Sequence, residues 1–388
     1  MAASSPRVAS PVERLVARYD PSVFHIGRPR ARIRISGPGL DAQDIVIAGE
    51  TTNVRPAESH RPDAELVADA DTWERLATDV RDGMAAFRSG QLRIRHDLHL
   101  GIGFLAATSA TDGPGRLRIR SVETSRGVIS TFEAGTGDPT LLIHGLGATK
   151  ASFLPTIAAL APSYRTIAVD LPGFGDSAKP LTGTYDAAYF ARAMTALLDA
   201  LGLERAHVIG NSMGGRVAIE VGLRNPERVG RLVLLAPSLA WLRPRRWAAA
   251  LRFVPTQLGL VQPAPRPLVE KIVRNMIPGA DNEWTSAGID EFLRSYLTPS
   301  GRAAFYAAAR HIYLEEPWGP SGFWTRLPSL QPSALFVWGR RDRLVPLAFA
   351  RHVREALPHS EHLELDCGHV PQLERPREAH DAMRRFLS

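Results

Sequence analysis

The amino-acid sequence predicts an α/β protein with two domains, the larger one built on a mostly parallel β-sheet that helices cover on both faces. Its 388 residues exceed the usual length of one domain. After residue 118, short apolar runs alternate with helical patterns, which is typical of parallel strands joined by helices. A stretch rich in Ser, Thr, Gly and Pro at 108–116 separates this pattern from a different one upstream. We therefore expect a small α+β domain over 1–107, a linker over 108–117 and the α/β domain over 118–388.

The N-terminal domain is expected to pack one amphipathic helix on a small sheet. Apolar residues from Trp73 to Phe87 recur at helical spacing, and Asp71 with Glu74 three positions later has the spacing of a capping box. Residues 92–104 alternate between apolar and polar side chains, which favours a strand with one buried face. Further strands are expected at 31–36 and 44–49.

The second domain contains six apolar runs that we expect to be strands. They lie at 140–145, 164–170, 206–212, 231–237, 334–339 and 362–366. A helix is expected at 186–201, where apolar residues line one face. The interval 238–325 is too long for a loop and must be an inserted subdomain. It holds five of the seven tryptophans, so we expect an aromatic-rich insertion.

Composition and charge exclude several classes of protein. Hydrophobic residues make up 44% and charged residues 22%, as in a folded globular chain. No apolar run approaches the roughly 20 residues of a spanning helix, and the N-terminus lacks the apolar core of a secretory signal, so a cytoplasmic location is expected. The net charge of +7 comes from arginines scattered among acids, which argues against a nucleic-acid partner. The single cysteine, Cys367, excludes an internal disulfide and a cysteine-rich zinc site, and no metal is expected.

The motif GNSMGG at 210–215 lies between an expected strand and an expected helix. It has the G-x-S-x-G pattern of a nucleophile elbow, in which Ser212 occupies a strained turn that exposes its hydroxyl. Gly210 and Gly214 are needed because the flanking backbones approach closely. The main-chain N–H of Met213, at the start of the following helix, is a candidate donor to an oxyanion.

The motif HGLG at 144–147 follows the first expected strand of this domain. Gly145 and Gly147 let the backbone turn so that an N–H points into the site, and we assign the second oxyanion donor to Leu146. His144 precedes the turn and is expected to brace the loop as a buried residue rather than to act in catalysis.

The acid and the base of a catalytic triad are expected after the nucleophile, each at the carboxyl end of a strand. Asp342 in WGRRDRLVP and His369 in CGHVPQLERP satisfy both conditions. In the expected mechanism, His369 takes the proton of Ser212, and Asp342 orients the imidazole. Other candidates close in sequence are Asp366, His359, His362 and His380, which we expect to be surface residues.

Residues 118–388 resemble the α/β-hydrolase superfamily. The resemblance rests on HG-x-G, the segment DLPGFGDSAKP at 170–180, the GNSMGG elbow, and the late Asp342 and His369. It implies an eight-stranded, mostly parallel sheet, a helical cap formed by the insertion at about 238–325, and no cofactor. A serine at position 212 is unlike the aspartate nucleophile of epoxide hydrolases and dehalogenases.

The expected function is hydrolysis of carboxylic esters with an apolar, lipid-like acyl or alcohol part, through an acyl-enzyme on Ser212. Acyl transfer by the same triad is an alternative. A second alternative is hydrolysis of a carbon–carbon bond in ring-cleavage products, for which the GNSMGG elbow is typical. Hydrolases of that kind usually carry an aromatic residue after the catalytic histidine, where this chain has Val370. A lipid-binding or scaffold protein is the non-enzymatic alternative. The sequence does not indicate an oligomeric state.

Two features point towards lipids. Residues 68–97 resemble part of a sterol-carrier-protein-2-type domain, which implies an apolar tunnel for a lipid, with an unrelated α+β domain as the alternative. The segment WLRPRRWAAALRFV at 241–254 is cationic and aromatic, a composition suited to peripheral contact with an anionic membrane. An ordinary cap helix is the interpretation that we prefer for this segment.

Overall fold

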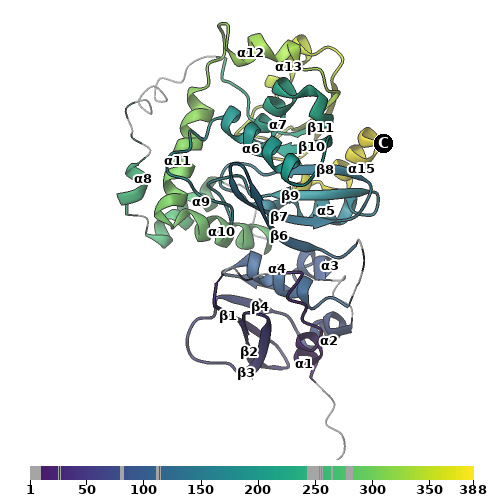
Figure 1. Ribbon diagram of the computed structural model, residues 1–388, viewed down its shortest axis with the longest axis vertical. Helices are drawn as coiled ribbons and strands as arrows, with labels where there is room; N and C mark the ends of the chain where they lie inside the picture. The colour runs from purple at the N-terminus through teal and green to yellow at the C-terminus, as the bar shows by residue number, and fades with distance from the viewer. Residues whose placement is uncertain are drawn as a thin grey trace, which may run out of the picture. The chain divides into compact units, whose positions relative to one another are not determined.

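The chain divides into two compact units, each described here by itself (Figure 1). The structure, a computed structural model, describes residues 10–388 except 25, 27, 79–82, 111, 112, 114, 243–252, 254, 256, 264 and 277–282. The first unit contains residues up to 120 together with 274–291. The second contains 121–273 and 292–388. The sequence places residues 274–291 in the cap of the second domain, whereas the structure assigns them to the first unit.

The first unit is built on a five-stranded sheet with the order β3-β2-β1-β4-β5. Strands β1 and β2 are antiparallel, and β1 and β4 are parallel. The strands are β1 (Arg30–Gly37), β2 (Leu40–Ala48), β3 (Thr51–Pro56), β4 (Ala64–Val67) and β5 (Arg93–Arg95). The helices are α1 (Pro11–Val16), α2 (Ala70–Thr78), α3 (Gly83–Arg88) and α4 (Leu98–Ala107). The strands expected at 31–36 and 44–49 are thus confirmed. The Arg95 guanidinium of β5 donates to the carboxylate of Asp290 at 2.6 Å, which ties the segment 274–291 into this unit.

The strand expected over 92–104 is wrong for most of its length. Only β5 is extended; the chain turns at His96, which has a positive φ of 76°, and α4 begins at Leu98. The side chain of Asp97 caps α4 by accepting the N–H of Leu100 at 2.9 Å. Apart from His99, every residue of α4 is buried. A helix without a polar face shows no 3.6-residue period, so its sequence was open to a strand interpretation.

The start of α2 also differs from the expected capping box. The carboxylate that caps it belongs to Asp69, which accepts the N–H of Thr72 at 2.7 Å, two positions before the expected Asp71.

Helix α4 is closely packed against Phe24, because a Cβ on Gly103 would lie 2.5 Å from the Phe24 ring. The lipid tunnel implied by the carrier-domain resemblance stays a prediction.

The second unit contains the expected eight-stranded sheet, in the order β13-β12-β11-β10-β8-β9-β7-β6. Its strands are β6 (Arg118–Thr124), β7 (Gly127–Ala134), β8 (Asp138–Ile143), β9 (Tyr164–Val169), β10 (Ala206–Asn211), β11 (Val229–Leu235), β12 (Ala334–Gly339) and β13 (Glu361–Leu365). Neighbours from β13 to β9 are parallel, and β7 is antiparallel to β9. The mostly parallel sheet is therefore confirmed.

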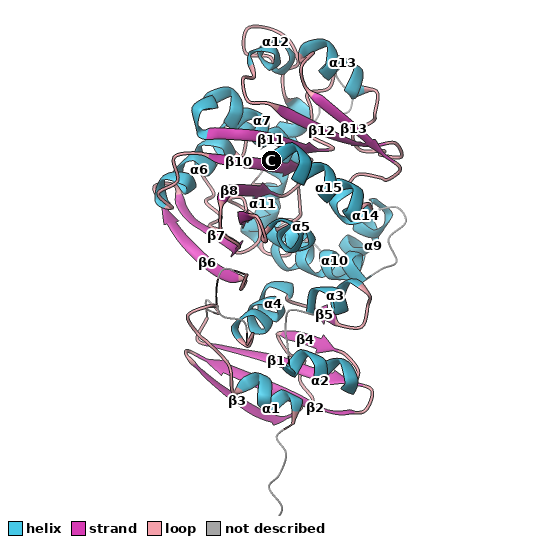
Figure 2. Cartoon of the chain, turned by 90° about the vertical axis from the view of Figure 1, so that its right-hand side faces the viewer, coloured by secondary structure: helices cyan, strands magenta, loops and turns pink. Residues whose placement is uncertain are grey.

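Helices cover both faces of this sheet, as Figure 2 shows. On one side lie α5 (Leu154–Leu160), α14 (Pro371–Glu374) and α15 (Pro376–Leu387), and on the other lie α6 (Ala187–Ala200) and α7 (Met213–Arg224). The helix α13 (Phe349–Ala356) joins β12 to β13. Coverage on both faces explains why all six residues of β12 are buried. The expected helix at 186–201 is α6, whose N-cap Asp186 accepts the N–H of Tyr189 at 2.6 Å.

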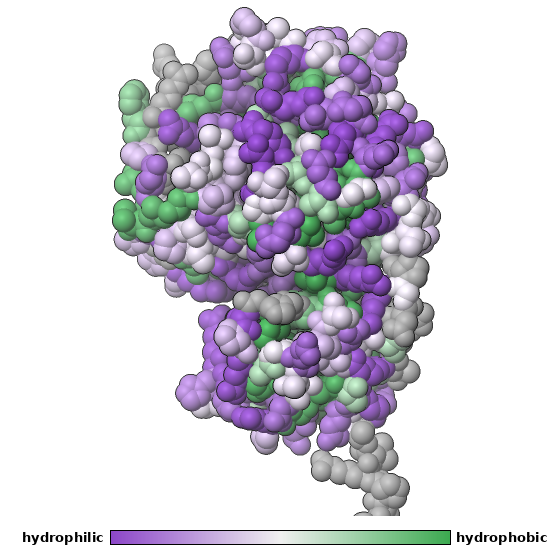
Figure 3. Space-filling model, in the orientation of Figure 1, coloured by the Kyte–Doolittle hydropathy of each residue, from purple (hydrophilic) through white to green (hydrophobic). Residues whose placement is uncertain are grey.

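In its described residues, the insertion between β11 and β12 consists of helices joined by loops. It contains α8 (Leu258–Val261), α9 (Arg266–Met276), α10 (Glu283–Tyr296), α11 (Pro299–Leu314) and α12 (Phe323–Arg326). Exposed apolar side chains gather at α8 and the start of α9, and Figure 3 shows this apolar area. They are Phe253, Leu258, Val261 and Leu268. Most of the cationic segment 241–254 lies outside the described residues. No helix in the described part of the chain is long and apolar enough to cross a membrane.

Candidate active site

Ser212 occupies a strained turn between β10 and α7. Its φ of 55° and ψ of −118° lie in a region that non-glycine residues rarely adopt. Its N–H donates to the carbonyl of Leu235 at 2.9 Å, and its own carbonyl accepts the N–H of Ser238 at 2.9 Å, so the end of β11 and the segment after it hold the turn on both sides. The serine is partly exposed, and within the described residues its hydroxyl makes no hydrogen bond.

The turn after β8 lies directly against this elbow. A Cβ added to Gly145 would lie 3.1 Å from the Cβ of Ser212, and one added to Gly214 would lie 2.0 Å from the carbonyl oxygen of Ile143. Gly214 is therefore required for the two backbones to approach, and Gly145 keeps a tight contact with the serine free of a further side-chain atom. In the described part of the chain, neither the N–H of Leu146 nor that of Met213 donates to a protein acceptor. Two main-chain donors are thus available beside the serine.

Asp342 and His369 lie in contact, although 26 residues separate them in sequence. The Nδ1 of His369 is 2.7 Å from Oδ2 of Asp342, whose other oxygen accepts the N–H groups of Leu344 and Val345 at 2.8 and 2.9 Å. The Asp342 side chain is fully buried, and that of His369 is 18% exposed. A carboxylate on Nδ1 fixes the tautomer with a proton there, so Nε2 retains the lone pair of a base.

One side chain connects this pair to the elbow. The amide nitrogen of Asn211, the residue before Ser212, donates to the carbonyl of His369 at 3.2 Å and to the carbonyl of Leu235 at 3.0 Å. The histidine loop is therefore hydrogen-bonded to the strand that carries the serine.

The other candidates near His369 in sequence lie elsewhere. His359 and Asp366 are exposed, and the Asp366 carboxylate faces Arg341. His380 pairs with the hydroxyl of Thr156 at 3.1 Å. The Nδ1 of His362 accepts the indole N–H of Trp338 at 2.9 Å. The surface position expected for these two histidines is wrong, because His380 is buried and His362 is half-buried.

His144 is completely buried beneath the turn. Its Nε2 accepts the N–H of Leu171 at 3.0 Å, so its Nδ1 carries the proton and donates to the carbonyl of Gly145 at 2.7 Å. Burial lowers the pKa of His144, which keeps the ring neutral. This arrangement supports the bracing role expected for His144.

A buried charge cluster behind the turn was not found from sequence. The ammonium of Lys150 lies 2.5 Å from Asp170 and 3.1 Å from Asp176, and Arg294 of α10 binds both oxygens of Asp176 at 2.7 and 2.9 Å. Burial would raise the pKa of Asp170, but the charge of Lys150 holds that pKa below its usual value. The segment DLPGFGD contains both carboxylates, and only the fold shows that they converge on a lysine.

A small apolar hollow begins at the turn that carries Leu146. Its lining contains no charged side chain and four aromatic ones. The lining residues are Gly147, Ala148, Phe174, Phe292, Ser295, Tyr296, Gly301 and Phe305. Gly147 has a φ of 75°, and a Cβ there would lie 2.9 Å from the ring of Phe292. The hollow is thus narrow where it meets the turn.

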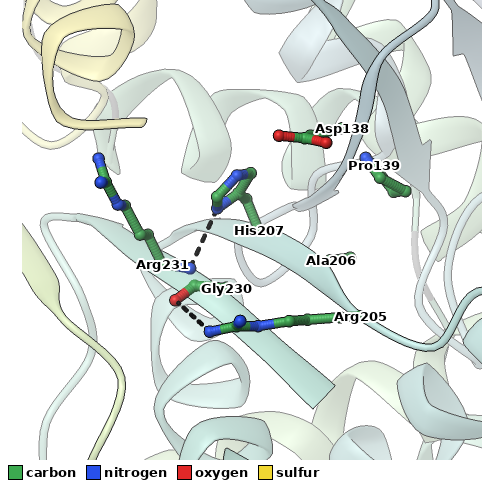
Figure 4. A pocket seen from close by; sticks show the side chains of 7 residues that line it. All are labelled: Asp138, Pro139, Arg205, Ala206, His207, Gly230 and Arg231. Atoms are coloured by element: carbon green, nitrogen blue, oxygen red, sulfur yellow. Dashed lines mark hydrogen bonds between the residues drawn. The ribbon is translucent and has the colours of Figure 1, made fainter. Parts of the chain in front are cut away.

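A larger pocket lies at the opposite edge of the sheet, at the amino ends of β8, β10 and β11. Figure 4 shows Arg205, His207 and Arg231 around it. The Arg205 guanidinium donates to the carbonyls of Val229 and Gly230 at 3.1 and 3.4 Å, and the N–H of Arg231 donates to His207 at 3.1 Å. These groups stabilise the ends of the strands. Among the described residues no group of three His, Cys, Asp or Glu side chains is placed to hold a metal.

Comparisons with known proteins extend these observations. Residues 138–376 match the family model of the alpha/beta hydrolase fold. A 2-hydroxy-6-oxononadienedioate/2-hydroxy-6-oxononatrienedioate hydrolase of Paraburkholderia phymatum is 31% identical over 66% of this chain and 89% of its own length. A 2-hydroxy-6-oxo-6-phenylhexa-2,4-dienoate hydrolase of Comamonas testosteroni is 28% identical over 67% and 91%. Among solved structures, a bacterial membrane phospholipase A is 28% identical, with a TM-score of 0.57 over 70% of this chain and 86% of that one.

Proposed function

The chain belongs to the α/β-hydrolase family, and we propose that it is a serine hydrolase in which Ser212 is the nucleophile, His369 the base and Asp342 the group that orients the base. The observation that carries this proposal is the contact of 2.7 Å between His369 Nδ1 and Asp342 Oδ2, on a loop that Asn211 ties to the elbow. It leaves Nε2 of His369 as the atom that can take the proton of Ser212.

The same residues account for each step of acyl chemistry. As Nε2 of His369 removes its proton, the oxygen of Ser212 attacks a carbonyl carbon. The carbonyl oxygen becomes an oxyanion and accepts the N–H groups of Leu146 and Met213. The positive end of α7 adds to this stabilisation. The protonated His369 then gives its proton to the leaving group, and water releases the acyl group from Ser212.

For the substrate, we propose a carbon–carbon bond next to a ketone, in a product of aromatic ring cleavage. The relatives named above support this class, because this chain matches about nine tenths of their length. A carbon leaving group needs stabilisation, which a conjugated 2-oxo acid supplies once the substrate is in its keto form. Collapse of the oxyanion breaks the bond between the ketone carbon and its CH₂ neighbour, and the electron pair enters the conjugated system. The proton from His369 goes to the enolate oxygen of the leaving group, so the CH₂ carbon becomes the end of a C=C bond; with one water to release the acyl group, the products are a carboxylic acid and a conjugated enol.

The hollow beside Leu146 offers an apolar lining for the acyl part of such a substrate, provided that the rings that narrow it move apart. Its aromatic residues, including Phe174 and Phe305, would contact a phenyl or alkyl group, and none of its lining side chains would pair with a second carboxylate. Desolvating an unpaired carboxylate is costly. The proposed substrate therefore carries an apolar group on the ketone, as in the 6-phenyl compound, and not the second carboxylate of a dioate.

Ester hydrolysis is the second candidate, and it is favoured by Val370. Ring-cleavage hydrolases usually carry an aromatic residue at this position after the histidine. The likeness to a membrane phospholipase A, at 28% identity, supports the same reading. Both reactions use the same acyl-enzyme.

A substrate comparison decides between the two. The purified chain is assayed with 2-hydroxy-6-oxo-6-phenylhexa-2,4-dienoate and with a series of p-nitrophenyl esters, with Ser212→Ala as the control. We expect kcat/KM for the dienoate to exceed that for the best ester by at least about tenfold, which corresponds to roughly 1.4 kcal/mol of transition-state stabilisation. The reverse order would replace carbon–carbon cleavage by ester hydrolysis. Turnover of neither, with no labelling of Ser212 by a fluorophosphonate, would overturn the serine-hydrolase proposal itself.

A further inference from the structure

The backbone around His369 is held by two side chains that no part of the triad includes. The carboxylate of Glu374 accepts the N–H of Gly368 at 2.6 Å and the N–H of Val370 at 3.0 Å. From the other direction, the amide of Asn211 donates to the carbonyl of His369 at 3.2 Å. Three consecutive residues are thus fixed by two side chains.

We propose that Asn211 and Glu374 are positioning residues that set the imidazole of His369 against Ser212. This inference rests on the proposed serine-hydrolase function and goes beyond it. The loop after β13 needs such support, because in the described residues the N–H groups of Gly368 and Val370 have no main-chain acceptor. Without Glu374, these two N–H groups would have no protein acceptor, because no helix or sheet hydrogen bond uses them.

The position of Asn211 makes it a direct link between base and nucleophile. The carbonyl of Leu235 on β11 accepts both the amide of Asn211 and the N–H of Ser212, at 3.0 and 2.9 Å. One carbonyl therefore fixes the backbone of the nucleophile and the side chain that holds His369. Asn211 is buried, so water does not compete for the hydrogen bonds that its amide makes.

The orientation of the ring also depends on this support. The hydrogen bond to Asp342 holds Nδ1, but a ring anchored at one atom can still tilt about that contact. Fixing the backbone on either side of His369 removes this freedom and directs Nε2. A displacement of about 1 Å in such a group can cost on the order of 10²-fold in rate. Glu374 is exposed, where its charge is screened by water, so its role lies in hydrogen-bond geometry.

The test compares Asn211→Asp, Glu374→Ala and Glu374→Gln with the wild-type chain. Asn211→Asp keeps the shape but turns a carboxylate towards two carbonyl oxygens. Glu374→Ala removes both acceptors, whereas Glu374→Gln keeps one. The matched control is Glu361→Gln, the same change at an exposed carboxylate of β13 that makes no hydrogen bond among the described residues. The readouts are the second-order rate of fluorophosphonate labelling of Ser212, and kcat and KM on the preferred substrate.

We expect labelling and kcat to fall by about tenfold or more for Asn211→Asp and Glu374→Ala, with KM within about twofold of wild type. Glu374→Gln should recover part of the loss, and Glu361→Gln should match wild type. Thermal unfolding establishes that the variants are folded, and Glu374, being exposed, provides the variant least prone to misfold. Folded variants that label at the wild-type rate would overturn the positioning roles while leaving the triad intact. A wild-type chain that is not labelled would instead overturn the triad, and the positioning roles with it.

Discussion

Lys150 and Asp170 form an ion pair that is shielded from solvent, with side-chain exposures of 1% and 0%. The Nζ of Lys150 lies 2.5 Å from Oδ2 of Asp170, and the N–H of Lys150 donates to Oδ1 at 2.8 Å. Lys150 also lies over the ring of Phe132, 4.8 Å from its centroid. The pair therefore fixes the segment just after the oxyanion turn to the end of β9.

Replacing Lys150 by Met should strongly destabilise the protein. The buried carboxylate of Asp170 would lose its countercharge, and breaking one side of such a pair costs roughly 3–5 kcal/mol. Urea denaturation of Lys150→Met measures the loss in the free energy of unfolding. The double variant Lys150→Met/Asp170→Leu should recover part of it, because it leaves no uncompensated charge. A single variant within about 1 kcal/mol of wild type would show that the pair contributes little.

Ser212→Ala should abolish turnover and fluorophosphonate labelling while leaving the fold intact. Loss of the nucleophile in a measured serine hydrolase costs on the order of 10⁶ in kcat. Steady-state kinetics and mass spectrometry of the labelled protein measure the two effects. Activity near the wild-type value would assign the nucleophile elsewhere.

Asp342→Asn should lower kcat by about 10⁴-fold with little change in KM. The amide keeps the shape of the carboxylate but favours the wrong tautomer of His369. Because the Asp342 side chain is buried and its Oδ2 lies 2.7 Å from Nδ1 of His369, the imidazole has little freedom to reorient. Kinetics on the preferred substrate measure the effect, and Asp366→Asn, at an exposed carboxylate, is the control. Equal losses in the two variants would contradict the assignment of Asp342.

Phe292→Ala should shift acyl preference towards larger groups. Phe292 stacks on Tyr296 at a centroid distance of 4.9 Å and narrows the hollow beside Gly147. Removing the ring should raise the ratio of kcat/KM for a bulky acyl group to that for a small one. Phe253→Ala is the matched control, because that ring is 86% exposed. An unchanged ratio in Phe292→Ala would place the acyl group elsewhere.

The free energy of unfolding should fall as the solution is acidified, and His362 should account for part of this fall. Burial, with the nearby charge of Arg354, lowers the pKa of His362 to about 4. The unfolded chain therefore binds a proton near pH 6.5, before the folded chain does, and the free energy of unfolding falls as the pH drops from about 6.5 to 4. Urea denaturation across this range measures the slope, which should be shallower in His362→Gln. An equal slope in the variant would assign the proton uptake to other groups.

Much of the second unit could be predicted because its signals are local. Short apolar strands, the glycines around Ser212 and the positions of Asp342 and His369 after strands each follow from neighbouring residues. The strand expected at 92–104 failed for a physical reason. Burial on all sides of α4 removes the polar face by which a helix is recognised.

The supports of the site could not be predicted in the same way. Asn211 stood inside the elbow motif and Glu374 inside HVPQLERP, but their partners follow from how loops meet after folding. The convergence of Asp170 and Asp176 on Lys150 likewise depends on contacts between separate segments. Spacing alone indicates which groups follow strands, and not which main-chain groups a side chain reaches.

The first unit is built from two separate pieces of the chain, and this limits where the coding sequence can be cut into parts that each fold. Residues 274–291 belong to that unit, and Asp290 among them receives the Arg95 guanidinium. A truncation at 108–117 would give a short fragment without Asp290 and a long one that carries Asp290 away from Arg95. No single cut yields two intact modules, so recombination that exchanges either half for a foreign one must replace both pieces of the first unit together.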